Sequence, residues 1–405
     1  MPIDSGDTAW LLASTALVMI MTPGVGFFYG GLVRRKNIVS MITLSLIAFA
    51  LVSVQWVLFG YSLAFGTDIN GIIGGLNFVG LNGVGQDAAV IAGVTLTVPA
   101  LAYMIFQLVF ATVTLAIVTS VFAERVKISS FIIFGLLWTT LVYDPLAHWV
   151  WGGGWLAQLG ALDFAGGTVV HISSGFSALA IALVIRKRVG FGKDLMEPSN
   201  IPLALLGVTL LWFGWFGFNS GSAVAANGLA ASAFVVTNTA AAAAALTWML
   251  LSWRTGRPAS LSLGSGAVAG LVAITPASGF VDIWGALAIG IIASVVCYGA
   301  MLFRIRKGID ESCDCWSVHG MGGLWGALAT GIFATTAVNN YSGLLYGNMD
   351  QFIHQVIAVA ASVSYSFVVT LILITILDKT IGMTVKNEEE YVGLDISQHG
   401  ERAFS

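Results

Sequence analysis

Long apolar stretches, each bounded by polar or glycine-rich residues, follow one another along almost the whole chain. A helix needs about 20 mainly apolar residues to cross the hydrocarbon core of a membrane. Eleven stretches approach or exceed this length and predict membrane-spanning helices at about residues 8–32, 38–65, 99–123, 130–148, 166–185, 201–219, 229–253, 260–276, 283–303, 317–335 and 351–377. The pattern therefore predicts an all-α polytopic membrane protein.

The composition agrees with this prediction. Of the 405 residues, 57% are hydrophobic and only 9% are charged, and the mean hydropathy is +0.90, far from the averages of soluble domains. No Lys or Arg precedes the first apolar stretch, so we expect a retained span there and not a secretory signal.

The basic residues alternate with the predicted spans. All 17 Lys and Arg residues follow odd-numbered spans, and none lies in an even-numbered connection. Basic loops face the cytoplasm, so we expect the N-terminus outside and the C-terminus in the cytoplasm. Because an extra or missing span would break the alternation, the charges support the count of eleven. We interpret the connection 66–98 as an external loop and the tail 380–405 as a polar, solvated end.

One short motif occurs twice, as Val170-His171 followed by Gly175 and as Val318-His319 followed by Gly323. The two copies lie in spans 5 and 10, an offset of five helices, so the two halves have opposite orientations in the membrane. Transport proteins are often built from such inverted repeats, with the substrate path at their interface. We expect a membrane domain over 1–379, with repeats at about 8–188 and 200–336 and a peripheral eleventh helix at about 351–377.

The two histidines are the main functional candidates, because ionisable groups inside a membrane are costly. If His171 and His319 face each other, the rings can share one hydrogen bond, and each ring keeps one nitrogen for a small polar guest. A buried pair that only holds two helices together is an alternative. A bis-histidine haem is a third, although the glycines nearby favour helices packed closely.

Aromatic residues crowd the expected outer ends of spans 3, 4 and 6, among them Phe110, Trp151, Trp215 and Phe218. An interfacial aromatic belt explains most such residues, but rings that face inward would form a cation–π site for a small ammonium-type ion. Ser222 can add a hydroxyl acceptor.

Asp163 precedes span 5 by a few residues. We expect its carboxylate to cap the helix and also to favour a cation at the outer mouth.

Nothing in the sequence indicates an enzyme. We find no phosphate-binding loop, no nucleophile with a base and no spacing typical of metal ligands. Cys297, Cys313 and Cys315 lack a second pair that would complete a zinc site. We expect no metal, no cofactor and no nucleic-acid partner.

Several motifs together resemble the ammonium transporter family (Amt/MEP/Rh), of the prokaryotic Amt type, over nearly the whole chain. They are Asp163-Phe-Ala-Gly-Gly-Thr-Val-Val-His171, Trp151-Gly-Gly-Gly-Trp155, Ala123-Glu-Arg125, Trp212-Phe-Gly-Trp-Phe-Gly-Phe-Asn219, His319-Gly-Met-Gly-Gly323 and Glu390-Tyr-Val-Gly-Leu-Asp395. The resemblance implies a homotrimer in the plasma membrane, with a path for ammonium or ammonia, and for methylammonium as an analogue, in each subunit. It also implies closure of the cytoplasmic face by a signalling protein of the PII class.

By position in these motifs, the family's outer recruitment site falls on Trp151, Phe110 and Ser222, and its essential aspartate on Asp163. Its stacked phenyl gate falls on Phe110 and Phe218.

The family's twin-histidine pair falls on His171 and His319, and Trp215 matches a tryptophan that lines the path below the gate. The stretch Cys313-Asp314-Cys315-Trp316 departs from the family's usual pattern at the inner mouth.

The expected function is therefore transport, in which ammonium is recruited outside, loses its proton and crosses the histidine pair as ammonia. The alternatives are a membrane ammonium sensor that signals through the cytoplasmic tail with little flux, and a passive gas or water channel.

Overall fold

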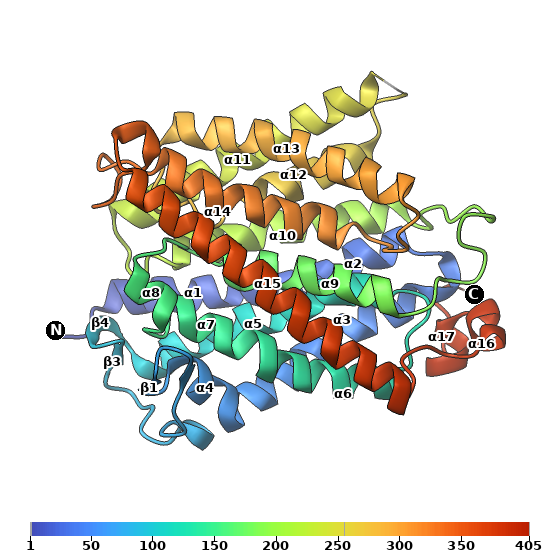
Figure 1. Ribbon diagram of the computed structural model, residues 1–405, viewed down its shortest axis with the longest axis horizontal. Coiled ribbons are helices and arrows are strands. Elements are labelled where there is room, and N and C mark those ends of the chain that lie inside the picture. The colour runs from blue at the N-terminus through green and yellow to red at the C-terminus, as the bar shows by residue number, and fades with distance from the viewer. Residues whose placement is uncertain (1, 255, 405) are drawn as a thin grey trace.

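The computed structural model describes residues 2–254 and 256–404, and it consists mainly of long helices that run roughly side by side (Figure 1). Residues 1 and 405, at the ends of the predicted membrane domain and tail, lie outside the described residues, as does residue 255.

Within the described part of the chain, nine helical segments are long and apolar enough to cross a membrane. They are Ser5–Leu32 (α1 Ser5–Met19, α2 Met21–Leu32), Arg35–Phe65 (α3 Ile38–Gln55, α4 Tyr61–Phe65), α5 Ala100–Phe122, Ile128–Leu159 (α6 Ile128–Trp138, α7 Asp144–Val150, α8 Trp155–Leu159), Gly167–Val184 (including α9 Ser173–Val184), α10 Ile201–Gly221, α11 Gly228–Trp253, α13 Ile283–Arg306 and α15 Met349–Thr380.

The other two predicted spans are helical but shorter. Helix α12 spans Ser260–Ile274, with 15 residues, and α14 spans Met321–Phe333, with 13 residues, after a π-helical turn at Trp316–Gly320. Each predicted stretch therefore contains a helix, whereas eleven full crossings and their orientation stay predictions. Helix α15 crosses the front of the bundle diagonally (Figure 1), as expected for a peripheral strap.

The two ends of the bundle differ in chemistry. The N-terminus, α8 and the strands lie at one end, which we call the tryptophan end after Trp149, Trp151 and Trp155; α16 (Asn387–Val392) and α17 (Leu394–His399) lie at the other, which we call the basic end (Figure 1). At the tryptophan end, the predicted loop 66–98 contains two antiparallel hairpins, β1 Asp68–Ile69 with β2 Ile73–Gly74, and β3 Ala88–Ile91 with β4 Val94–Pro99. Strands this short have too little apolar alternation to stand out in the sequence.

Small residues let helices of the second half approach closely. A Cβ atom at Gly290 of α13 would collide with the backbone carbonyl of Ala240 on α11, and one at Gly270 of α12 would lie 2.5 Å from the same oxygen. Such contacts are typical of membrane helices, where close backbone packing replaces hydrophobic burial as the source of association.

A buried ion cluster closes the basic end. Asp310, just before the π-helical turn that leads into α14, accepts hydrogen bonds from Arg125 at 2.9 Å and from the Nη2 of Arg188 at 2.7 Å. Burial alone would raise the pKa of Asp310, but the charge of Arg125 and the hydrogen bonds and charge of Arg188 together lower it. Burial also lowers the pKa of Arg125 to about 10, although the charge of Asp310 opposes this shift.

The interpretation of the tail as a solvated end is wrong. Glu390 is buried and accepts hydrogen bonds from Arg186 and from the amide of Val189, both at 2.6 Å. Asp395 accepts the amide of Ser40 at 2.8 Å, and Leu394 is fully buried. The acidic run looked solvated because the arginine that pairs with it is about 200 residues away in the sequence.

We predict that Gly290→Ala destabilises the folded protein by about 1–3 kcal/mol, because the added methyl group overpacks the α11–α13 contact. Gly299→Ala, on an open face of the same helix, is the matched control, and alanine's helix propensity should make it neutral or stabilising by up to about 1 kcal/mol. Thermal denaturation in detergent measures both. Equal stability of the two variants would contradict the packing account.

We predict that Asp310→Asn lowers stability by about 3–5 kcal/mol, because it leaves the buried guanidinium of Arg125 without its anion and leaves Arg188 paired only with Glu124, at 3.6 Å. Since the folded pKa of Asp310 is lowered, the stability it contributes is present above the unfolded pKa of about 3.9 and is lost as the pH falls through the folded pKa. The wild type should therefore lose more thermal stability on acidification than Asp310→Asn does. Glu388→Gln, at an exposed carboxylate of α16, should behave as the wild type; an identical acid response in all three proteins would contradict this assignment.

Candidate functional site

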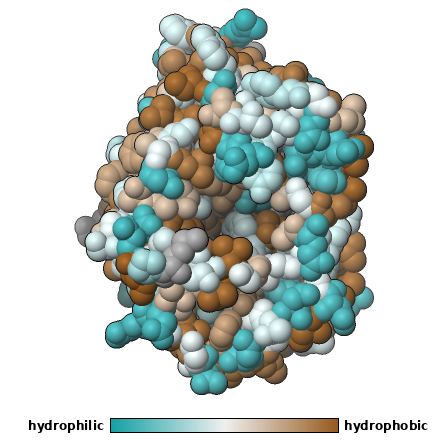
Figure 2. Space-filling model, turned by 90° about the vertical axis from the view of Figure 1, so that its left-hand side faces the viewer, coloured by the Kyte–Doolittle hydropathy of each residue, from teal (hydrophilic) through white to brown (hydrophobic). Residues whose placement is uncertain are grey.

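Three aromatic rings meet at the tryptophan end of the bundle. The rings of Phe110 on α5 and Phe218 on α10 are stacked, with centroids 4.1 Å apart and planes 26° apart. Trp151 lies edge-on to Phe110, with centroids 6.0 Å apart. Phe110 and Phe218 are buried and Trp151 is half-buried, so the tryptophan lies nearer the surface than the phenyl pair does. Figure 2 shows this end of the molecule, which is hollowed near its centre.

The carboxylate of Asp163 is bonded to backbone amides at the start of a helical turn, as we expected of a capping residue. Its carboxylate accepts the amides of Gly166, Gly167 and Thr168, each at 2.7 Å, and also the hydroxyl of Thr168. Its own carbonyl oxygen accepts the indole N–H of Trp151 at 3.0 Å. Asp163 thus fixes the start of the π-helical turn Gly167–Ile172 and the tilt of the tryptophan together.

Ser222 follows the last residue of α10, one turn beyond Phe218. Its hydroxyl donates to the carbonyl oxygen of Phe218 at 2.8 Å, and the residue is half-buried. The hydroxyl oxygen therefore keeps acceptor capacity for a guest at the mouth.

The two predicted histidines are in direct contact. Their Nδ1 atoms are 3.2 Å apart, which is within hydrogen-bond distance, and both residues are buried. The other ring nitrogen of His171, Nε2, is buried and has no hydrogen-bond partner within residues 2–254 and 256–404. With the rings touching, no space remains between them for a haem, so that alternative does not fit.

The shared glycine of the two motifs explains this contact. A Cβ atom at Gly175 would collide with the backbone of Gly320, next to His319, and one at Gly323 would lie 2.8 Å from the Cβ of His171. Each motif's glycine therefore makes room for the other motif's histidine segment. Both histidines also lie in π-helical turns, Gly167–Ile172 and Trp316–Gly320, a local geometry that is frequent at functional sites and that periodicity did not reveal.

Trp215 lines the passage between the phenyl pair and the histidines. Its ring stacks on His171 with centroids 5.4 Å apart, and its indole N–H donates to the hydroxyl of Thr275 at 2.8 Å. Thr275 carries no signal in the sequence, because its contact with Trp215 depends on the packing of α12 against α10.

The space beside the histidines is very small. A cavity of about 10 Å³ is bordered by Phe218, Trp215, His171 and His319, which is about enough for one molecule the size of water. Its lining contains no Lys, Arg, Asp or Glu among the described residues. The five predicted residues Phe110, Phe218, Trp215, His171 and His319 thus form one continuous column.

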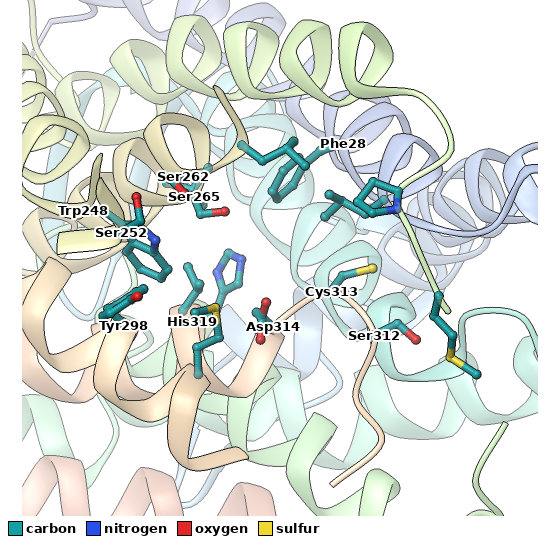
Figure 3. A pocket seen from close by; sticks show the side chains of 17 residues that line it. Phe28, Trp248, Ser252, Ser262, Ser265, Tyr298, Ser312, Cys313, Asp314 and His319 are labelled. Atoms are coloured by element: carbon teal, nitrogen blue, oxygen red, sulfur yellow. The ribbon is translucent and has the colours of Figure 1, made fainter. Parts of the chain in front are cut away.

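A larger cavity of about 380 Å³ lies on the other side of His319, toward the basic end (Figure 3). The sequence analysis did not assign its lining, which includes Trp248, Tyr298, Ser265, Cys313 and Asp314.

Asp314 is the acidic group of this larger cavity, and it pairs with Arg304 at 2.9 Å. Burial, with the charge of Glu311, raises the pKa of Asp314 to about 6 against the opposing charge of Arg304. Of the unusual stretch Cys313-Asp314-Cys315-Trp316, Cys313 and Asp314 line this larger cavity, and the contact between the histidines is intact.

Comparisons with known proteins identify the family of the chain. The model of the Ammonium Transporter Family matches residues 9–404. The chain is 58% identical over 404 residues to "Ammonium transporter Amt1" of Archaeoglobus fulgidus, with 100% of both chains covered.

Two solved structures have the same fold. The crystal structure of Saccharomyces cerevisiae Mep2 is similar with a TM-score of 0.90 at 36% identity, over 96% of this chain and 89% of that one. A structure named "Sensor Amt Protein" also has a TM-score of 0.90, at 29% identity over 97% and 98% of the two chains.

We predict that Asp163→Ala costs more stability than the loss of an ordinary helix cap, because it leaves several amides of Gly166–Thr168 unsatisfied at about 1–3 kcal/mol for a buried group. Asp282→Ala is the matched control, since Asp282 caps α13 by accepting only the amide of Gly285 and should cost about 1 kcal/mol. Thermal unfolding in detergent compares them. A smaller effect at position 163 than at 282 would contradict the described role.

Proposed function

Since the chain belongs to the Ammonium Transporter Family, we propose that it recruits ammonium at the aromatic mouth, removes its proton and conducts ammonia past the histidine pair. The observation that carries this proposal is the direct contact of His171 and His319, 3.2 Å apart, at the end of an apolar column of rings. In this proposal Trp151, Phe110, Ser222 and Asp163 form the recruitment site.

Each recruitment residue offers a cation a different attraction. The faces of Trp151 and Phe110 attract a cation through their ring quadrupoles, and the hydroxyl oxygen of Ser222 can accept an N–H. Asp163 acts through its field, because backbone amides occupy its carboxylate. The stacked rings of Phe110 and Phe218 must part for the guest to pass, and they form the gate.

The column favours a neutral guest over an ion. Moving a charge into an apolar interior costs far more than moving a neutral polar molecule, and the small cavity has no carboxylate in its described lining. Ammonia can accept or donate a hydrogen bond at the unpaired Nε2 of His171. Potassium cannot lose a proton, so the same column excludes it.

The larger assembly follows from the resemblance and from the distribution of charge. We infer a homotrimer in the plasma membrane, with the tryptophan end outside and the basic end in the cytoplasm. The reciprocal glycine contacts between the two motifs support inverted repeats at about 8–188 and 200–336, within a membrane domain of 1–379 that includes the eleventh helix at about 351–377. A PII-type protein would dock on the loops and the tail, 380–405, at the basic end.

A membrane ammonium sensor is the second candidate, because the structure named "Sensor Amt Protein" shares the fold. Shared fold does not separate flux from sensing. Uptake of ammonium, methylammonium and water into proteoliposomes separates the candidates: rapid uptake of the first two without matching water flow supports a transporter, and saturable binding without uptake supports a sensor.

We predict that His171→Ala and His319→Ala each lower methylammonium uptake or transport current by about tenfold or more, since losing a buried hydrogen bond to the guest costs about 1–3 kcal/mol. We also expect the ammonium-over-potassium selectivity to fall, because the bore widens. His354→Ala, in α15 and outside the column, is the matched control and should transport as the wild type does. Intact uptake with unchanged selectivity in both pore variants would remove the pair from the mechanism.

A further inference from the structure

We infer that His148 and Asp68 share one ionisable proton at the tryptophan end, and that this protonated pair positions Trp151 for ammonium recruitment. The inference rests on the proposed function for its consequence in transport. His148 is a positioning residue here, since its imidazole touches neither the column nor the cavities described above.

The imidazole of His148 lies between two oxygen atoms. Its Nδ1 is 2.9 Å from the backbone carbonyl oxygen of Ala64, and its Nε2 is 2.8 Å from an oxygen of Asp68. The side chain of His148 is fully buried, whereas that of Asp68 is 36% exposed. The pair can therefore exchange a proton with the medium through the aspartate.

The two oxygens determine how many protons the pair holds. A carbonyl oxygen and a carboxylate accept hydrogen bonds but do not donate them, and a neutral imidazole has only one N–H. Both short contacts are satisfied only when the ring is an imidazolium facing a carboxylate, or when a neutral ring accepts from a protonated aspartate. Either form holds one proton more than a neutral ring beside an ionised carboxylate.

Among the described residues, the hydrogen-bond partners of the ring are Ala64 and Asp68. A Cβ atom at Gly152 would lie against both the imidazole and the carbonyl oxygen of Ala64, so no space remains there. Of the neighbouring acidic groups, Asp144 is one turn earlier on α7 and accepts from Gln55, and Asp163 is turned toward its own amides. On α4 the titratable side chain is Tyr61, whose ring packs among aromatic rings.

The same contact joins two backbone segments. Asp68 also accepts the amide of Gly71 at 2.8 Å, and the carbonyl oxygen of Gly71 accepts the amide of Trp155 at 2.9 Å. The carbonyl oxygen of His148 accepts the amides of Gly152 and Gly154 at 3.0 and 2.9 Å. Trp151 lies inside this bonded loop, so the pair fixes where the tryptophan meets Phe110.

Loss of the proton reverses the interaction. With a neutral ring and an ionised aspartate, one ring nitrogen presents a lone pair to an oxygen atom, and the contact becomes repulsive. The segment 66–75 then loses its contact with the imidazole and is held to α7 mainly by the hydrogen bond from Trp149 to the carbonyl oxygen of Ile72. Trp151 keeps its hydrogen bond to Asp163, but the loop that contains it is held less firmly. Recruitment should weaken as the outside pH rises and the pair gives up its proton.

Asp68→Asn tests the proton directly. The amide can donate to Nε2 while Nδ1–H donates to Ala64, and its carbonyl oxygen can accept from Gly71, so the contact survives without an ionisable proton. We expect the variant to transport as the wild type does at mildly acidic outside pH. At alkaline outside pH the methylammonium uptake of the wild type should be about tenfold lower than that of Asp68→Asn, mainly because its KM is higher. A tenfold difference corresponds to ~1.4 kcal/mol.

The measurement is initial uptake of methylammonium by intact cells that have no other ammonium transporter, over a range of outside pH. Comparison at each pH cancels the change in ammonium speciation. Asp87→Asn, an exposed aspartate of the same loop, is the matched control and should follow the wild type. A constant ratio of wild type to Asp68→Asn across the range would overturn the inference.

Amide hydrogen exchange of the segment 66–75 in the purified full-length protein gives a second test that does not depend on transport. The ratio of the amide exchange rates of the wild type and Asp68→Asn should rise with pH, because only the wild-type contact between His148 and Asp68 is weakened by loss of a proton. A ratio that does not change with pH would overturn the inference even if uptake varied. If the exchange ratio of wild type to Asp68→Asn rises with pH but the protein shows no uptake, the protonated His148–Asp68 contact is supported and the proposed function is contradicted.

Discussion

The close approach of two glycine-bearing helical segments is the constraint on which the rest of the site depends. Gly175 and Gly323 have no side chain at the positions where the histidine segment of the other half packs against them. Without that space, the Nδ1 atoms of His171 and His319 could not lie 3.2 Å apart. Every later element, from the stack of Trp215 to the cavity the size of one water molecule, takes its position from that contact.

The main buried carboxylates outside the column are held by hydrogen bonds. Asp163 is bonded to the backbone, and Asp310 and Glu390 are bonded to arginines at the basic end. Buried polar groups without partners are costly. The Nε2 of His171 is one of several such atoms among the described residues, and it differs from the bonded carboxylates in lying beside a small apolar cavity.

Much of this arrangement follows from the sequence. The apolar stretches indicated where the helices lie, and the repeated Val-His-x-x-x-Gly motif indicated that His171 and His319 could face each other. The capping role of Asp163 followed from its place before glycines. These features are local patterns, or pairs of patterns related by a simple spacing.

The features that the sequence analysis missed depend on tertiary contacts. Thr275 receives the indole N–H of Trp215 only because α12 packs on α10. The tail packs on the basic end because Arg186 lies far from Glu390 in sequence. The π-helical turns shift the register by a single residue, which apolar periodicity does not resolve.

The ratio of ammonium to potassium flux in a Gly175→Ala protein tests the central claim most directly, because it leaves both histidines in place and changes only the helix contact. The account predicts that the added methyl group pushes the two segments apart, so that the ratio falls well below that of the wild type. A folded Gly175→Ala protein with wild-type flux and a wild-type ratio would contradict it.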